Sequence, residues 1–209
     1  MKYDAVIVAS GKGVRANLGY NKAFYVMKDG SSVLMHTVSV FKCDADCERI
    51  IIVTNKEYMN RIPEDEKIIL VEGGQERKDS VRNGLNKVES EYVLIHDGAR
   101  PFLHPEALEE VKEKVTETGA VVLGHMAFDT VKIVNDGIVE KTIDRNTVFM
   151  AETPQAFKSE LIKDAYARCA DIVFTDDASL AESLGIKVHI VIDRFDNRKL
   201  TSEEDFRDL

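Results

Sequence analysis

The stretch AVIVASGKGVR, residues 5–15, decides the fold of this chain. Its apolar run at residues 5–9 has the length of a buried strand, and the glycines that follow favour a tight turn. The run is too short for the apolar part of a signal peptide or for a membrane span. No later stretch approaches the roughly 18 apolar residues of a span. We therefore expect a cytoplasmic protein that begins with a strand and a glycine-rich loop.

Beyond this strand, short apolar runs alternate with helical patterns. The further predicted strands are residues 50–53, 68–71, 92–95, 120–123 and 188–192. The predicted helices are residues 33–41, 81–88, 108–115, 161–169 and 176–184. Repeated strand-then-helix order predicts an α/β fold, with a Rossmann-like, mostly parallel sheet and helices on both faces, in a single domain over residues 1–209.

Ligands of such sheets bind at the carboxyl ends of the strands. The loops that begin near Ser10, Glu72, His96 and His125 should therefore hold the chemistry.

Residues 129–150 depart from the alternation of strands and helices. They contain short strand-like pieces around an N-D-G turn at residues 135–137, which suits a hairpin. We interpret this segment as a β-arm that protrudes from the main sheet.

Two residues are predicted to begin helices. Ser32 is expected to cap the helix that follows it, and Pro105 can be the first residue of another helix.

Composition excludes several classes of protein. The chain has 209 residues, a formal net charge of −9 and a pI of about 5.1. Non-specific nucleic-acid binding needs a basic surface, so we expect no nucleic-acid partner. The cysteines, Cys43, Cys47 and Cys169, are odd in number and lack C-x-x-C spacing, which argues against a disulfide framework or a zinc site. Cys169 falls in an apolar stripe and is predicted to lie in the core.

The first loop has the composition of a phosphate-binding loop. Glycines after a strand let backbone N–H groups approach phosphate oxygens, and two nearby cations, Arg15 and Lys22, could hold a triphosphate. A dinucleotide fingerprint is excluded because Ala16 occupies its third glycine position, and the Walker A pattern is absent. A plain connecting turn is the alternative, although such a turn does not need fixed cations.

This loop resembles the A-A-G-x-G-x-R…P-K signature of nucleotidyltransferases that activate sugars and alditol phosphates. Ser10 stands where the signature has its second Ala, and Asn21 where it has Pro. Without the proline, the loop that carries Lys22 is expected to be looser.

The next motif narrows the resemblance. The segment GGQERKDSVRNGL, residues 73–85, is similar to the G-G-x-x-R-x-x-S-V-x-N-G-L segment of the methylerythritol-phosphate cytidylyltransferases, which contacts the cytosine base. Ser80 could instead be an ordinary helix cap. The resemblance implies a set of CTP-binding residues, namely Ala9, Ser10, Gly11, Gly13, Gly74, Gln75, Ser80 and Gly98.

The segment HDGARPF, residues 96–102, resembles the family's H-D-A-A-R-P motif, with Gly98 in place of Ala. Asp97 at a strand end could hold Mg²⁺ or a substrate hydroxyl, and Arg100 could grip a phosphate. An Asp–Arg pair that only braces the loop is the alternative. His96 is interpreted as a structural histidine.

The arm carries further matches. The D-T-V-K at residues 129–132 and the I-D-R-N at residues 143–146 match the family, which implies that Thr130 and Arg145 bind the acceptor phosphate across the interface of a homodimer. Without the resemblance, a solvated charge is the simpler interpretation of Arg145. The segment ETPQAF follows, in which Glu152 replaces the usual Gln.

Two motifs complete the resemblance. The T-D-D-A-S at residues 175–179 matches the family and also suits a helix start capped by Thr175. The D-N-R-K-L-T at residues 196–201 resembles the family's N-x-K-x-T and would return Lys199 to the active site. Together the matches run from Ala9 to Thr201.

The resemblance implies that CTP and 2-C-methyl-D-erythritol 4-phosphate react to give the CDP-alditol and pyrophosphate, in the non-mevalonate synthesis of isoprenoid precursors. Arg15 and Lys22 would stabilise the transition state, Arg145 and Lys199 would hold the acceptor, and Mg²⁺ would bridge the triphosphate beside Asp97. The alternatives are a ribitol-5-phosphate cytidylyltransferase and a nucleotide-binding module that has lost catalysis.

Overall fold

The computed structural model describes residues 1–11, 18–168, 172–207 and 209. Its strands are β1 (Tyr3–Ala9), β2 (Cys47–Thr54), β3 (Ile68–Glu72), β4 (Tyr92–Asp97), β5 (Ala120–Met126), β6 (Val131–Asn135), β7 (Ile138–Ile143), β8 (Phe149–Lys158) and β9 (His189–Ile192). Its α-helices are α1 (Val33–Cys43), α2 (Arg77–Leu85), α3 (Pro105–Thr118), α4 (Ser159–Arg168) and α5 (Asp177–Ser183). The 3₁₀ helices are η2 (Lys22–Phe24), η3 (Lys56–Arg61), η4 (Arg145–Thr147) and η5 (Glu203–Phe206).

The described residues form a seven-stranded sheet in the order β3-β2-β1-β4-β8-β5-β9. β1 pairs in parallel with both β2 and β4, and the pairs β2–β3 and β5–β9 are also parallel. Only β8, among these strands of the described chain, runs antiparallel to its neighbours β4 and β5. The prediction of a mostly parallel α/β sheet is confirmed.

β8 is the strand that the sequence analysis missed. The sequence pattern predicts that residues 148–150 belong to the arm, and it predicts no strand in the segment that follows them. In the structure, β8 continues from the arm into the centre of the sheet, where its residues pair with β4 from Lys158 to Gln155. Pro154 and the polar residues beside it conceal the strand, because central strands are usually apolar and avoid proline.

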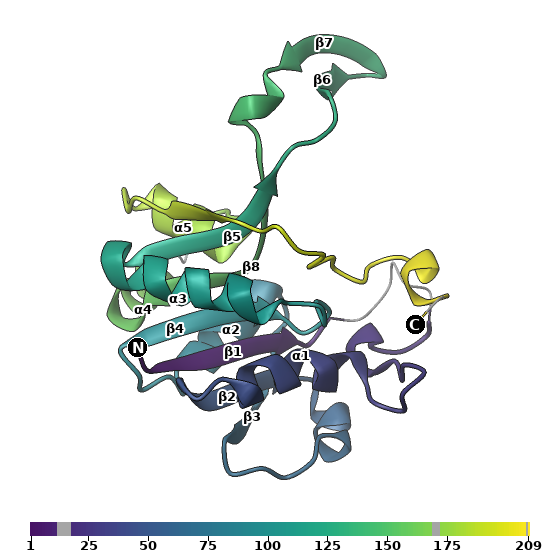
Figure 1. The fold of residues 1–209 in the computed structure, drawn as a ribbon, viewed down its shortest axis with the longest axis vertical. Helices are drawn as coiled ribbons and strands as arrows, with labels where there is room; N and C mark the ends of the chain where they lie inside the picture. The colour runs from purple at the N-terminus through teal and green to yellow at the C-terminus, as the bar shows by residue number, and fades with distance from the viewer. Residues whose placement is uncertain (12–17, 169–171, 208) are drawn as a thin grey trace.

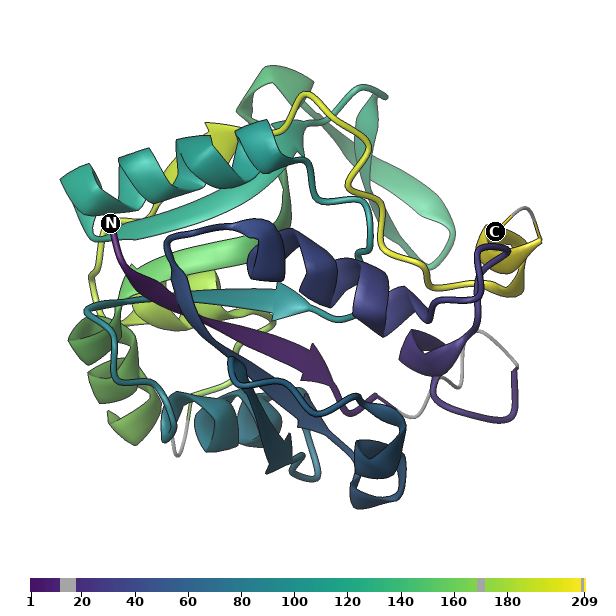
Figure 2. The same ribbon diagram turned by 60° about the horizontal axis from the view of Figure 1, so that its bottom comes forward.

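Helices cover both faces of the sheet, as predicted. α1 and α3 lie over one face and pack with Ala5 and Ile7 of β1 in one hydrophobic cluster (Figures 1 and 2). α2, α4 and α5 pack on the other face, around a cluster that includes Val6. Side chains of a strand alternate between faces, so β1 contributes to both clusters. Each fully buried Val or Ile stabilises the fold by about 1.5–3 kcal/mol.

β6 and β7 form a two-stranded hairpin that extends away from the main sheet (Figure 1). Its turn is Asp136-Gly137, and both residues have positive φ angles, 48° and 77°. This is the conformation that two-residue hairpin loops require, and it explains the N-D-G sequence. The predicted β-arm is therefore present. Ile138 at its tip is 70% exposed, which is unusual for an isoleucine.

Most of the residues predicted to begin helices do so in the structure. Ser32 caps α1 by accepting a hydrogen bond from the Met35 N–H, and Pro105 is the first residue of α3. The predicted cap of α5 was wrong, because Asp176 and not Thr175 accepts from the Ser179 N–H. Both residue types are good caps, so the sequence leaves the position open by one residue.

In the part of the chain that the structure describes, no helix combines the length and the apolar composition needed to cross a membrane. The prediction that Cys169 lies in the core concerns a residue outside the described part.

Candidate active site

A cavity of about 780 Å³ lies at the carboxyl ends of β1 and β4, beside the C-terminal segment. Several residues predicted from the sequence line it, namely Ala9, Ser10, Gly11, Lys22, Gly74, Gln75, Asp97 and Lys199. They come from the loops after β1, β3 and β4 and from residue 199, which are distant in sequence. The position agrees with the rule that parallel sheets bind ligands at the carboxyl ends of their strands.

Lys22 is the first residue of η2 and lines the cavity beside the loop after β1. Asn21, immediately before it, is 4% exposed and ties this segment to the end of β1. Its Nδ2 donates to the Ala9 carbonyl oxygen at 2.5 Å, and its backbone N–H donates to the Tyr58 hydroxyl at 3.1 Å. These hydrogen bonds hold the end of the loop beside Lys22, while residues 12–17 of the same loop lie outside the described residues. Arg15 and Gly13, also predicted site residues, lie outside the described residues.

Ser80 is buried beneath two residues that line the cavity, Ser10 and Gly74. Its fully buried hydroxyl accepts a hydrogen bond from the Gly74 N–H at 3.0 Å and lies 2.8 Å from the Ser10 hydroxyl. Space here is tight, since a Cβ added at Gly73 would lie 2.5 Å from the Ser10 Cβ. Ser80 thus joins the first loop to the second, and the helix cap of α2 is Glu76 instead.

Gly98, another predicted CTP-binding residue, packs beneath the first loop. Its N–H donates to the Val8 carbonyl oxygen at 2.9 Å. A Cβ added there would lie 3.0 Å from the Ala9 Cβ and 3.2 Å from Leu34. Gly98 therefore sets how closely β4 approaches the first loop.

Asp97 is the electrostatic centre of the cavity. Its Oδ2 accepts a hydrogen bond from the Lys199 Nζ at 2.6 Å, and its Oδ1 lies 3.6 Å from the Arg77 Nε. Burial alone would raise the pKa of Asp97, but the charges of Arg77, Lys199 and Arg100 hold it well below its usual range. The carboxylate is therefore ionised at any pH at which the protein works.

Arg77 is a cavity residue to which the sequence analysis gave no role. Its Nη2 donates to Oδ2 of Asp177 at 2.8 Å, and the other oxygen of Asp177 accepts from the Tyr166 hydroxyl at 2.5 Å. Although burial opposes the charge of Arg77, the carboxylates of Asp177 and Asp97 raise its pKa above the usual range. Asp177 is 100 positions away, so no local spacing could have revealed the pair.

His96 and Arg100 brace the loop after β4. His96 is fully buried between the Arg100 carbonyl oxygen and the Thr153 hydroxyl, and burial lowers its pKa to about 4. It is thus neutral and structural, as predicted. Arg100 is also buried, and its Nη1 donates to the Asn197 carbonyl oxygen at 2.7 Å. Arg100 is not among the described residues that line the cavity.

The arm residues are not brought to this cavity within one chain. Thr130 and Arg145 are exposed, and the Arg145 Nη1 donates to the Phe128 carbonyl oxygen at 2.7 Å. Arg145 begins η4 at the base of the hairpin, which points away from the sheet (Figure 1).

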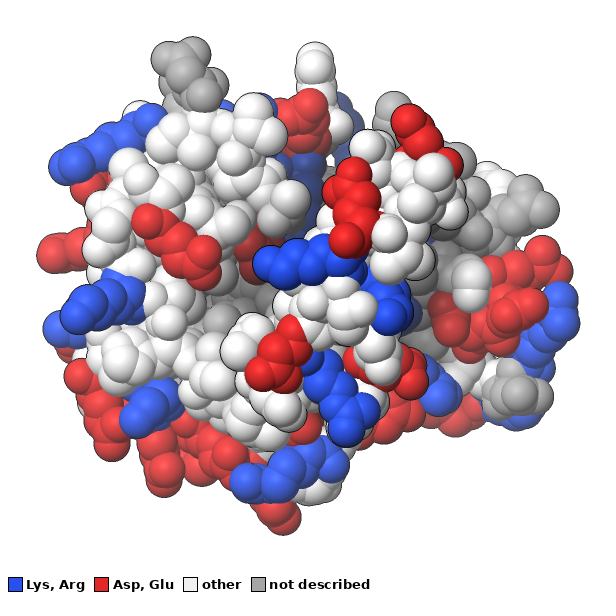
Figure 3. Space-filling model, turned by 90° about the horizontal axis from the view of Figure 1, so that it is seen from above, with Lys and Arg blue, Asp and Glu red and all other residues white. Residues whose placement is uncertain are grey.

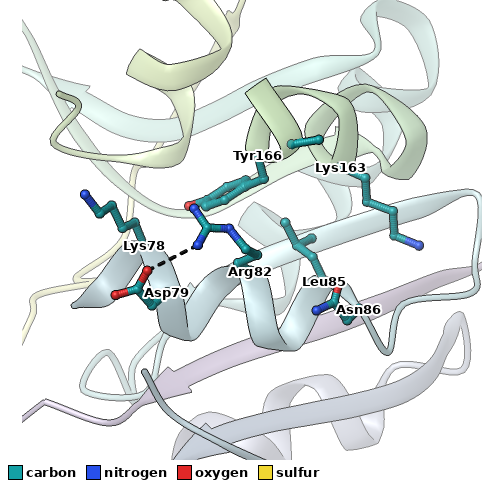
Figure 4. Close-up of a pocket in the computed structure, with 8 residues that line it drawn as sticks. Lys78, Asp79, Arg82, Leu85, Asn86, Lys163 and Tyr166 are labelled. Carbon is teal, nitrogen blue, oxygen red and sulfur yellow. Dashed lines mark hydrogen bonds and ion pairs between the residues drawn. The ribbon is translucent and has the colours of Figure 1, made fainter. Parts of the chain in front are cut away.

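A second cavity, of about 760 Å³, lies between α2 and α4. Figure 4 shows Arg82 of α2 reaching toward Tyr166 of α4, with Asp79 beside it. Two of its cations have nearby counter-charges: Arg82 lies 3.3 Å from Asp79, and Lys78 lies 3.0 Å from Glu76. The described residues that line it include neither the glycine-rich loop after β1 nor Asp97 and Lys199, so we assign the chemistry to the first cavity.

Comparisons with known proteins agree with the fold and the motifs. The family model of IspD, 2-C-methyl-D-erythritol 4-phosphate cytidylyltransferase, matches residues 3–208. The protein of that name from Bacillus licheniformis is 40% identical, over 98% of this chain and 93% of the relative. Its namesake from Clostridioides difficile is 38% identical, over 97% of this chain and 90% of the relative.

Solved structures give the same result. The crystal structure of 4-diphosphocytidyl-2C-methyl-D-erythritol synthase from Anaerococcus prevotii superposes with a TM-score of 0.86 at 32% identity, covering 98% of this chain and 93% of that chain. The Francisella tularensis cytidylyltransferase gives a TM-score of 0.84 at 28% identity, covering 97% and 96% of the two chains. The chain belongs to the 2-C-methyl-D-erythritol 4-phosphate cytidylyltransferase (IspD) family.

Proposed function

We propose that this chain transfers the cytidylyl group of CTP to 2-C-methyl-D-erythritol 4-phosphate and releases pyrophosphate, a step in isoprenoid precursor synthesis. One observation carries the proposal: Lys22, Asp97 and Lys199, which are far apart in sequence, share one cavity at the strand ends. The backbone of residues 9–11 lines the same cavity and offers N–H groups to phosphate oxygens.

The reaction needs positioning more than covalent chemistry. An oxygen of the acceptor phosphate attacks the α-phosphorus of CTP in line, and the bond to pyrophosphate breaks on the opposite side. The nucleophile is already an anion, so no base has to take a proton from it. In this proposal the backbone of Gln75 and the carbonyl oxygen of Gly74, both of which line the cavity, pair with the cytosine edge.

The main barrier is repulsion between two anions. We assign to Lys22 and Arg15 the stabilisation of the charge that develops on the leaving pyrophosphate, and to Lys199 the binding of the acceptor phosphate. The protein as a whole is acidic, with a net charge of −9. On the face seen in Figure 3, basic side chains are interspersed with acidic ones.

Mg²⁺ is the proposed cofactor, and Asp97 its protein neighbour. No group of three His, Cys, Asp or Glu side chains suited to a metal occurs among the described residues. The ionised carboxylate of Asp97, which lines the cavity with Glu76, nevertheless fits Mg²⁺, which is commonly bound by one or two carboxylates and by substrate phosphates. When bound, the ion would neutralise triphosphate charge, while Lys199 and Arg77 hold Asp97 in place.

The proposed assembly is a homodimer through the arm. Arg145 and Thr130 would then reach the acceptor phosphate in the partner subunit's cavity, which accounts for their exposure in a single chain. The exposed apolar side chain of Ile138 on the arm is consistent with burial in an interface. We expect the enzyme to act in the cytoplasm, without nucleic acid or membrane.

A pyrophosphate-release assay tests the proposal. CTP, ATP, GTP and UTP are each combined with 2-C-methyl-D-erythritol 4-phosphate or ribitol 5-phosphate, with and without Mg²⁺. We expect release only with CTP, the methylerythritol phosphate and Mg²⁺. Preference for ribitol 5-phosphate would support the other cytidylyltransferase activity. Binding of CTP without release for either acceptor would instead indicate a module that has lost catalysis.

A further inference from the structure

We propose that Glu152 is a positioning residue, which holds in place the C-terminal segment that presents Lys199 to the cavity. The family motif has Gln at this position, and this chain has Glu. The kinetic part of the inference rests on the proposed function, because Lys199 is taken to bind the acceptor phosphate.

Glu152 on β8, Arg100 after β4 and Asn197 in the C-terminal segment form a closed set of contacts. The Asn197 Nδ2 donates to Oε2 of Glu152 at 3.1 Å and to the Thr153 carbonyl oxygen at 2.9 Å. The Arg100 Nη1 lies 3.6 Å from Oε1 of Glu152 and donates to the Asn197 carbonyl oxygen at 2.7 Å. Both the side chain and the backbone of Asn197 are thus held.

The held residue lies two positions before Lys199. One further hydrogen bond, from the Leu200 N–H to the Ala99 carbonyl oxygen at 2.9 Å, fixes the segment on the other side of Lys199. Between these two anchors, the ammonium group of Lys199 reaches Asp97. Without the Glu152 carboxylate, Asn197 would keep, of these contacts, only its bonds to the Thr153 carbonyl oxygen and to Arg100. Arg100 would lose this counter-charge, so the first anchor would be weaker.

A glutamate is energetically unfavourable at position 152, because its charged side chain is mostly buried. Its side chain is 11% exposed, and burial raises its pKa, against the opposing effects of Arg100 and Asn197. Asp193, which follows β9, adds to the increase, and His125 on β5, 3.9 Å away, opposes it. A Gln of the same shape would keep the hydrogen bond to Asn197 without a buried charge. What the carboxylate adds is an ion pair with Arg100, and with it a dependence on pH.

The first test is kinetic and compares Glu152→Ala with Glu152→Gln. We expect Glu152→Ala to raise the KM for the acceptor about tenfold, through loss of both contacts, and to leave the KM for CTP within twofold. Glu152→Gln should restore most of the acceptor affinity at pH 8. Glu113→Gln, at an exposed position of α3, is the matched control and should change neither constant.

The second test is the pH profile, which a merely space-filling role would not change. As the pH falls, Glu152 of the parent enzyme takes up a proton and its ion pair with Arg100 is lost. The KM for the acceptor should therefore rise more steeply toward acid pH in the parent than in Glu152→Gln. Asp97 cannot cause this difference, because neighbouring positive charges hold its pKa well below the usual range of an aspartate and it stays ionised throughout. Ionisation of the acceptor phosphate cannot cause it either, because it is common to both proteins.

The third test needs no activity. In a double-mutant cycle of Glu152→Ala and Asn197→Ala, measured by urea unfolding, the double variant should lose less stability than the sum of the single variants. Additive losses, or an unchanged acceptor KM in Glu152→Ala, would overturn the inference. An inactive parent enzyme would instead refute the proposed function, and the unfolding cycle would still decide whether Glu152 holds the segment.

Discussion

The Nζ of Lys199 lies 2.6 Å from Oδ2 of Asp97, although 102 positions separate the two residues. The end of β4 and the C-terminal segment are thereby joined by a charge-assisted hydrogen bond. Asp97 in turn faces Arg77, which is held by the buried Asp177. Acidic and basic side chains alternate along this series, so Lys199 and Arg77 are both held in place before a substrate arrives. Such preorganisation is the main source of catalytic power in phosphoryl chemistry.

Lys22→Ala should lower kcat about 10²–10³-fold, because one oriented charge at the leaving group is lost. Lys22 is only partly buried, so the melting temperature should stay close to that of the parent. Initial rates at saturating substrates and a thermal melt measure both effects. Lys87→Ala, at an exposed position, is the control and should retain full activity. Near-normal turnover of Lys22→Ala would remove Lys22 from its proposed role.

Asp177→Asn should reduce both stability and activity. The substitution leaves the Arg77 charge without its nearest partner, at a cost of about 3 kcal/mol in the free energy of unfolding. Arg77 would then be free to shift relative to Asp97, and kcat should fall. Urea unfolding and initial rates are the measurements. Tyr166→Phe, which removes the hydrogen bond to the other oxygen of Asp177, should cost about 1 kcal/mol. Equal stability of Asp177→Asn and the parent would contradict the description of this pair.

His96 should make the protein less stable in mild acid. Its pKa is lowered to about 4 in the fold, against about 6.5 in the unfolded chain, so the unfolded chain takes up the proton first as the pH falls. The free energy of unfolding should decline from pH 6.5 to pH 4 by up to about 3 kcal/mol. Urea unfolding at several pH values measures this decline, and it should be much smaller in His96→Gln. Parallel profiles for the two proteins would mean that His96 does not titrate as described.

Most of the fold could be predicted because its signals are local. The apolar runs of β1, β2 and β4 and the N-D-G turn of the arm each specify their own structure. β8 could not be predicted, because Pro154 and Gln155 lie in a central strand whose pairing comes from distant residues. Tertiary contacts there override the local preference.

The site residues that belong to short sequence motifs could be predicted, whereas the contacts between distant residues could not. Lys22, Asp97 and Lys199 were identified from their neighbours in sequence, and the structure brings them to one cavity. Arg77 was part of a quoted motif, but its role depends on Asp177, whose position only the fold determines. Likewise, the anchoring of the first loop by Asn21 depends on a carbonyl group that only the folded chain places beside it.

In the proposed dimer, the cavity of one subunit works with the arm of its partner. Lys22→Ala and Arg145→Ala affect different parts of the chain, the cavity and the arm. A mixed dimer of the two variants would contain one intact site, assembled from the unaltered cavity of one subunit and the unaltered arm of the other.

The most direct measurement is therefore the cytidylyl-transfer activity of the two variants purified separately and after coexpression. Each alone should be nearly inactive. Coexpression in equal amounts should recover roughly a quarter of the parent activity, since half of the dimers would be mixed and each would have one working site. Activity in the coexpressed sample no greater than the mean of the separate variants would contradict the shared site.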